Sequence, residues 1–194
     1  MTEPTIIAID ESIATTDSGE IYVIGSAILI DPTQRNELNQ AAMDALRSGS
    51  PDRRRPFHWT DEGREIRAAM IRAVSASAAV PIAAVRPQAN MSAEATRLEC
   101  LRLLFRETAE LGVDLILFES REKERKNIGQ NRTDHQAVTE ARHSKLLPPT
   151  ARYEWIDKSD PIAWLADAIA GAVNLHERDD QTYTDSLDQL RILR

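Results

Sequence analysis

The stretch IYVIGSAILI at residues 21–30 places the strongest constraint on the fold. It carries no charge, and aliphatic residues occupy both of the faces that alternate along a strand. A strand that is apolar on both faces belongs in the interior of a sheet that is covered on both sides. Helices must therefore pack on both faces of the sheet that contains this strand.

Strand and helix patterns alternate along the rest of the chain. Residues 5–10 form a second apolar strand, and the turn signal TTDSGE joins it to 21–30 as an antiparallel hairpin. Further strands are predicted at 80–85, 113–120 and 153–157, and helices at 33–47, 62–78, 92–112 and from about Asp160 onward. The sequence thus predicts an α/β fold in one domain, residues 1–194, with a mixed sheet and helices on both faces.

Composition narrows the class of protein. A chain of 194 residues with 42% hydrophobic residues can bury one core, and its net charge of -7 argues against a protein that coats nucleic acid by bulk electrostatics. Cys100, the one cysteine, can form no intrachain disulfide. No apolar run reaches the roughly 20 residues that span a bilayer, and the N-terminus lacks the features of a signal peptide. We expect a cytoplasmic protein without membrane contact.

The segment PIAWLADAIAGAVNL at 161–175 predicts a core helix that contains one acid. Asp167 is its only charged residue, and apolar side chains occupy nearly the whole circumference. A buried carboxylate needs a cation, a metal ion or hydrogen-bond donors, because its desolvation costs several kcal/mol otherwise. A partner arginine and a metal ion are both open interpretations of Asp167 taken alone.

Two other acids end apolar strands and favour the metal interpretation. Alternation places Asp10 on the same face as Ile6 and Ala8, and it places Glu119 at the end of the strand that begins at 113. Carboxylates gathered at one end of a sheet repel each other unless a cation holds them, and Mg2+ or Mn2+ prefers such oxygen ligands. Two ions about 4 Å apart would activate a water and stabilise the leaving oxygen of a phosphodiester. Glu11 has the opposite parity and is the weaker ligand candidate.

Several motifs together resemble the bacterial domain-of-unknown-function 3800 family. They are IIAIDES, the hairpin strand IYVIGSAIL, FHWTDE, LILFES and the closing YEWIDKSDPIAWLADAIAGAV. The resemblance spans most of the chain and implies a ribonuclease H-like fold. In that superfamily two metal ions are bound by a first-strand Asp, a mid-domain strand acid and a last-helix acid, which here implies Asp10, Glu119 and Asp167. The chain departs from the family at Ile13, where Gly is usual, and at Trp164, where Gln is common.

Other residues are candidates for substrate contacts. His58 precedes a predicted helix and has a counterpart in relatives near the acid cluster, although a lone His is more often structural. Lys158 lies between the last strand and the last helix, where it could neutralise a phosphate or belong to a capping turn.

The segment at 121–145 is basic in an acidic chain and can form a helical insertion within 121–150. Its seven basic and four acidic residues give it a local charge of +3. It could neutralise a nucleic-acid backbone through Arg121, Arg125 and Lys126, or it could be a solvated helix with Glu-Arg pairs.

Two classes of function compete. The first is a nuclease that hydrolyses RNA or DNA with Mg2+ or Mn2+ held by the three acids. The second is a non-catalytic ribonuclease H-like module that binds nucleic acid or a protein partner. An actin-like ATPase is disfavoured because the chain has no Gly-rich nucleotide segment, so we expect no nucleotide cofactor. The closing segment 178–194 is either a helix packed on the sheet or a contact within a homodimer.

Overall fold

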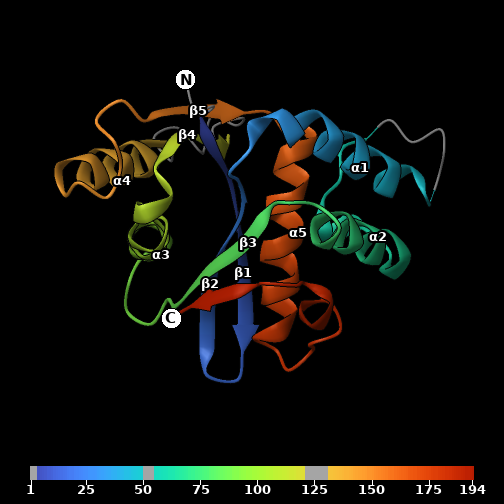
Figure 1. Ribbon diagram of the computed structural model, residues 1–194. Coiled ribbons are helices and arrows are strands. Elements are labelled where there is room, and N and C mark those ends of the chain that lie inside the picture. The colour runs from blue at the N-terminus through green and yellow to red at the C-terminus, as the bar shows by residue number, and fades with distance from the viewer. Residues whose placement is uncertain (1–3, 50–54, 121–130) are drawn as a thin grey trace.

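A computed structural model describes residues 4–49, 55–120 and 131–194, which form an α/β fold around one six-stranded mixed sheet (Figure 1). The strand order is β5-β4-β1-β2-β3-β6. The strands are β1 (Thr5–Thr16), β2 (Gly19–Leu29), β3 (Val80–Pro87), β4 (Val113–Glu119), β5 (Arg152–Ile156) and β6 (Arg191–Leu193). The helices are α1 (Arg35–Arg47), α2 (Arg64–Ser75), α3 (Ala93–Glu107), α4 (Asn131–His143) and α5 (Pro161–His176).

The N-terminal hairpin forms as the sequence predicts. β1 pairs antiparallel with β2 from Ile6 to Thr16. Gly19 begins β2 at a φ of +118°, a conformation that residues with a side chain rarely adopt. β2 pairs antiparallel with β3, whereas β4 pairs parallel with β1 and β5 parallel with β4. The first strand is therefore central, as expected, and both of its neighbours are buried.

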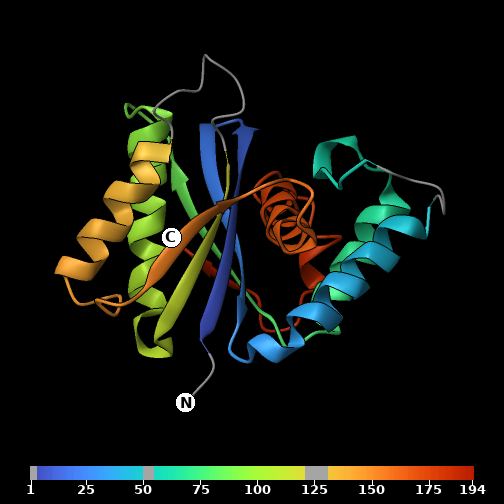
Figure 2. The ribbon, with the colours of Figure 1, turned by 90° about the horizontal axis from the view of Figure 1, so that it is seen from above.

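Helices cover both faces of the sheet, which confirms the inference from residues 21–30. Figure 2 shows α3 and α4 on one side of the sheet and α5, α1 and α2 on the other. Alternate residues of β1 divide accordingly: Ile7 and Ile9 pack with α3 and α4, and Ile6 and Ala8 pack with α5. The period-two alternation of the strand therefore determines which layer each side chain contacts.

Helix α5 is apolar on all sides because it is enclosed on all sides. It packs directly on β1 and β2, and the α1–α2 pair packs on its outer surface (Figure 2). Every residue from Ile162 to Asn174 is buried. Gly25 of β2 permits the closest approach, because a Cβ there would collide with backbone atoms of Ala166 and Ala170. The helix axis therefore passes immediately over the middle of β2.

Of the two interpretations of residues 178–194, the closing helix is wrong, and the contact within a homodimer stays a prediction. Residues 184–186 form one 3-10 turn, and Arg191–Leu193 form β6, which pairs parallel with β3. The exposed edge of β3 offers unpaired backbone groups, and a strand satisfies them where a helix could not. Among the described residues, no helix has the length and apolar character needed to cross a bilayer.

Candidate functional site

Asp10 and Glu119 lie on the face of the sheet that α5 covers. The residues two and four positions earlier in each strand, Ile6 and Ala8 in β1 and Leu115 and Leu117 in β4, belong to the core that includes α5. The parallel register pairs Ile9 with Phe118, so the next residues along each strand are Asp10 and Glu119. The two carboxylates therefore leave neighbouring strands at the same level and on the same face.

Asp167 reaches this level from α5. The antiparallel register pairs Asp10 with Gly25, and α5 passes over Gly25 with the turn that contains Ala166 and Ala170. Asp167 belongs to that turn, and its side chain is 9% exposed. The three acids singled out in the sequence are thus brought to one region by the register of β1, β2 and β4 and by the crossing of α5.

The charges of the other two acids affect the ionisation of Asp10. Burial raises the pKa of its carboxyl group well above the ordinary value, and the charges of Asp167 and then Glu119 raise it further. Lys158 and Arg97 act in the opposite direction with smaller effects. Burial and its two acidic neighbours therefore oppose the ionisation of Asp10.

Asp167 is held by the segment that precedes α2. The backbone N–H of Trp59 donates to Oδ2 of Asp167 at 2.9 Å, and Nδ1 of His58 lies 3.3 Å from the same oxygen. The hydrogen bond with Asp167 raises the pKa of the His58 imidazole, and burial opposes that effect. His58 therefore contacts the acid cluster, as the sequence suggested. Trp59 packs its indole against Gly171, where a Cβ would collide with the ring.

Glu119 is paired with Lys158. The Nζ atom of Lys158 lies 2.9 Å from Oε1 of Glu119, and the two side chains are 40% and 11% exposed. Burial acts to lower the pKa of Lys158, but the bond with Glu119 and the charges of all three acids outweigh it and raise the pKa. Lys158 was predicted to contact a substrate phosphate, and the structure places it against an acid of the cluster.

Glu11 points to the opposite face and lies apart from the other three acids. Its carboxylate forms a salt bridge with Arg97 of α3, whose Nε atom also lies 2.7 Å from Oδ1 of Asp134 in α4. Arg97 is 1% exposed, and Asp134 is fully buried and also accepts a hydrogen bond from Trp155. We therefore leave Glu11 out of the metal site that is proposed below.

The structure describes only part of the basic segment at 121–145. Arg121, Arg125 and Lys126 lie outside the described residues, so their predicted contacts with a nucleic-acid backbone stay a prediction. The described remainder includes α4, which packs against α3.

Sequence reasoning missed the Arg97–Asp134 pair and the role of the Trp59 N–H. One signal was present for Arg97: it shares a helical stripe with Leu101 and Leu104, which predicts burial. A backbone donor such as the Trp59 N–H leaves no such signal in a sequence.

Each of the three acids has one carboxylate oxygen that a described residue already contacts. Oδ1 of Asp10 accepts from the N–H of Glu11, Oδ2 of Asp167 accepts from Trp59, and Oε1 of Glu119 pairs with Lys158. The second oxygen of each carboxylate has no hydrogen bond to a described residue, and carboxylate oxygens are the ligands of Mg2+ and Mn2+. Within the described ranges, no group of three or more His, Cys, Asp or Glu side chains is arranged to hold a metal ion.

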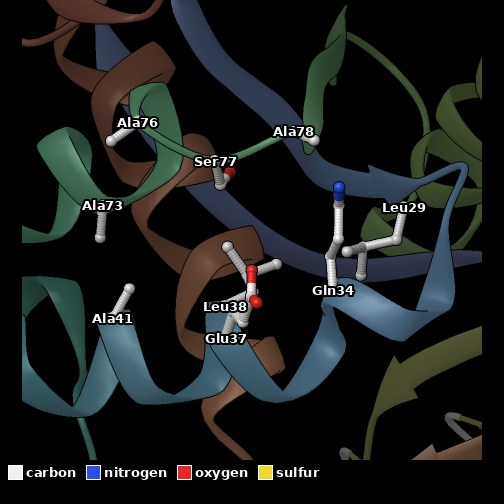
Figure 3. A pocket seen from close by; sticks show the side chains of 9 residues that line it. All are labelled: Leu29, Gln34, Glu37, Leu38, Ala41, Ala73, Ala76, Ser77 and Ala78. Carbon is white, nitrogen blue, oxygen red and sulfur yellow. The ribbon is translucent and has the colours of Figure 1, made fainter.

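A cavity of about 360 Å³ lies away from these acids, between α1 and the end of α2 (Figure 3). Alanine and leucine side chains contribute much of its wall, and Glu37 is its one charged lining residue. It therefore offers no concentration of ligands for a metal ion or of donors for a phosphate.

Replacing Asp10 with Asn is expected to stabilise the protein at neutral pH when divalent ions are absent. A carboxyl group whose pKa is higher in the folded than in the unfolded state lowers stability as pH rises from the unfolded to the folded pKa. The gain should therefore vanish below the unfolded pKa, about 3.9. Thermal melts in chelator across pH 3 to 8 measure it, with the exposed Asp188→Asn as the control. Destabilisation of Asp10→Asn at pH 7 would contradict the raised pKa.

The sequence matches no protein-family model, and no curated protein is significantly similar to it. The interpretation of the acid cluster therefore depends on its geometry and on the chemistry of its residues.

Proposed function

We propose that the protein is a ribonuclease H-like, metal-dependent nuclease of the domain-of-unknown-function 3800 family that hydrolyses phosphodiester bonds of RNA or DNA. The observation that carries the proposal is the meeting of Asp10, Glu119 and Asp167 at one level of the sheet, from two strands and one helix. The sheet combines three consecutive antiparallel strands, β1 to β3, with β4 and β5, which run parallel to β1. This arrangement supports the proposed ribonuclease H-like fold.

The three acids would hold Mg2+ or Mn2+ through the oxygens that make no described contact. When bound, two such ions supply positive charge that lowers the pKa of the attacking water and stabilises the leaving oxygen. Such charge would favour the ionised form of Asp10, which burial and its two acidic neighbours oppose. The N–H of Trp59 fixes the orientation of Asp167, and Lys158 holds one oxygen of Glu119 in a salt bridge.

The chain also supports a second candidate, the non-catalytic module that binds nucleic acid or a protein partner. The observation that favours it is that Lys158 and His58 already compensate Glu119 and Asp167 without a metal ion. Such compensation lets the acids persist as a structural cluster.

Calorimetry with Mn2+ separates the two candidates. The nuclease proposal expects the wild-type protein to bind Mn2+, and it expects Asp10→Asn and Asp167→Asn to weaken binding strongly because each removes a charged ligand. Asp188→Asn, which removes an exposed acid of the C-terminal segment, should bind Mn2+ as the wild type does. If the wild type binds no divalent ion at millimolar concentration even with nucleic acid present, the binding module is the better description.

A further inference from the structure

A second pocket, of about 250 Å³, opens beside the acid cluster between β1, the start of α2 and the C-terminal end of α5. The residues that matter to its chemistry are Ser12, Trp59, Thr60, Arg67, Asn174 and Arg178. Every one of these side chains carries a hydrogen-bond donor, and none of the lining residues is an acid. The chain as a whole has a net charge of -7, but the lining of this pocket is positively charged. The pocket can therefore attract an anion locally.

The two arginines are held in position by carbonyl groups. Nε of Arg67 donates to the carbonyl of Trp59 at 2.9 Å, and its guanidinium lies 5.0 Å from the centre of the Trp59 ring. Nε of Arg178 donates to the carbonyl of Asn174 at 3.4 Å. Neither guanidinium forms a salt bridge with a described carboxylate. The carboxylate of Asp180 bonds to Thr182, and the charge of Arg178 makes a smaller contribution to the lowered pKa of Asp180. Positioned guanidinium groups with remaining N–H donors match the oxygens of a phosphate.

The pocket is joined to the acid cluster through three elements. Ser12 follows Asp10 by two residues on the same face of β1, a distance of about 7 Å. Asn174 follows Asp167 by nearly two turns of α5, about 10 Å. The amide of Asn174 donates to Ser12 Oγ at 2.7 Å, which ties helix to strand.

The Trp59 backbone makes the third connection. Its N–H donates to Asp167 in the cluster, and its carbonyl accepts from Arg67 in the pocket. Arg67 is therefore positioned by the same residue that orients an acid of the proposed site.

We propose that this pocket binds a backbone phosphate of a nucleic-acid strand, roughly two to three nucleotides away from the phosphodiester that lies at the acid cluster, an assignment that rests on the proposed function. The separation of about 7 to 10 Å corresponds to roughly two to three nucleotides at a rise of about 3.4 Å per nucleotide. Arg67 and Arg178 provide the charge, and Asn174 and Ser12 keep the pocket aligned with the cluster. The pocket then determines on which side of the reacting bond the strand is held.

The test measures binding of a labelled single strand of about 12 nucleotides, a length within known single-strand site sizes, by fluorescence anisotropy. Ca2+ replaces Mn2+ so that cleavage does not intervene, and the KCl concentration is varied. The double variant R67Q/R178Q is expected to bind at least about tenfold more weakly, because two charge-assisted hydrogen bonds are lost. The slope of log affinity against log salt concentration should fall in magnitude by about 0.7, since the pocket neutralises one single-strand phosphate.

Two further variants test whether a loss of binding comes from the pocket itself and not from the lower net charge or from misfolding. R72Q/R106Q removes two exposed arginines, one from α2 and one from α3 on the other face, and should bind as the wild type does. If R67Q/R178Q does not fold because Trp59 loses its partner, R178Q alone changes an exposed residue beyond the end of α5. Its salt slope should fall by at most about 0.7, because Arg67 remains at the same phosphate.

Three results would overturn the subsite. They are unchanged strand affinity in R67Q/R178Q, absence of strand binding by the wild type, and a 5′-mononucleotide that binds the two arginines as tightly as the strand does. The last result would indicate a mononucleotide site instead.

Experiments can contradict the phosphate subsite and the nuclease proposal independently of each other. A wild type that binds a strand through the arginines but cleaves nothing in Mn2+ contradicts the nuclease and supports the subsite. A wild type that cleaves with the same KM as R67Q/R178Q contradicts the subsite and supports the nuclease.

Discussion

Replacing Asp167 with Asn is expected to lower Mn2+-dependent cleavage of RNA or DNA by about 10² to 10⁴-fold, because the ions supply several kcal/mol of transition-state stabilisation. The change keeps the size of the side chain and removes its charge from the cluster around Asp10. Single-turnover cleavage of labelled RNA and DNA in Mn2+ or Mg2+ measures the loss. The wild type should be inactive in Ca2+ and in chelator.

The fold should survive this change. An Asn side chain at 167 can still accept the N–H of Trp59 through its amide oxygen, and it no longer repels Asp10. The melting temperature without divalent ions should therefore equal or exceed that of the wild type, and the control Asp188→Asn should keep full activity. Strong destabilisation of Asp167→Asn would mean that its charge anchors the core, and unimpaired cleavage would remove it from the metal site.

Replacing Arg97 with Met is expected to destabilise the protein by about 3–5 kcal/mol, the usual cost of removing one partner from a buried ion pair. Arg97 and Asp134 are almost completely buried, and Arg97 also holds Glu11, the residue after Asp10. The change therefore withdraws the guanidinium from two carboxylates in the layer formed by α3, α4 and the sheet. Chemical denaturation followed by circular dichroism gives the free energy of unfolding.

Two variants make this result specific to the buried pair. Arg102→Met removes an arginine of the same helix whose bridges to Glu99 and Glu140 lie at the surface, so it should cost at most about 1 kcal/mol. Asp134→Asn combined with Arg97→Met should recover part of the loss, because the buried charge is gone and Trp155 keeps an acceptor. A loss in Arg97→Met no greater than in Arg102→Met would show that the buried pair contributes little.

Local periodicity predicted much of the site. Alternation along residues 5–10 determined that Asp10 shares the face of Ile6 and Ala8 and that Glu11 does not, and the structure confirms both placements. The uncharged circumference of 161–175 likewise predicted a core helix. These inferences succeed because adjacent residues fix the direction of a side chain once a strand or helix forms.

The partners of the acids were decided by tertiary structure alone. The bonds of Asp167 to His58 and Trp59, of Glu119 to Lys158 and of Arg97 to Asp134 join segments that are far apart in the chain or separated by other elements. Tertiary structure also decided β6. The pattern of the C-terminal segment suggested a helix, but its last residues form a strand because they pair with the open edge of β3. Contacts of this kind depend on the register of the strands and on the crossing of α5 over Gly25. Register and crossing follow from how the completed layers pack, so no local sequence pattern specifies them.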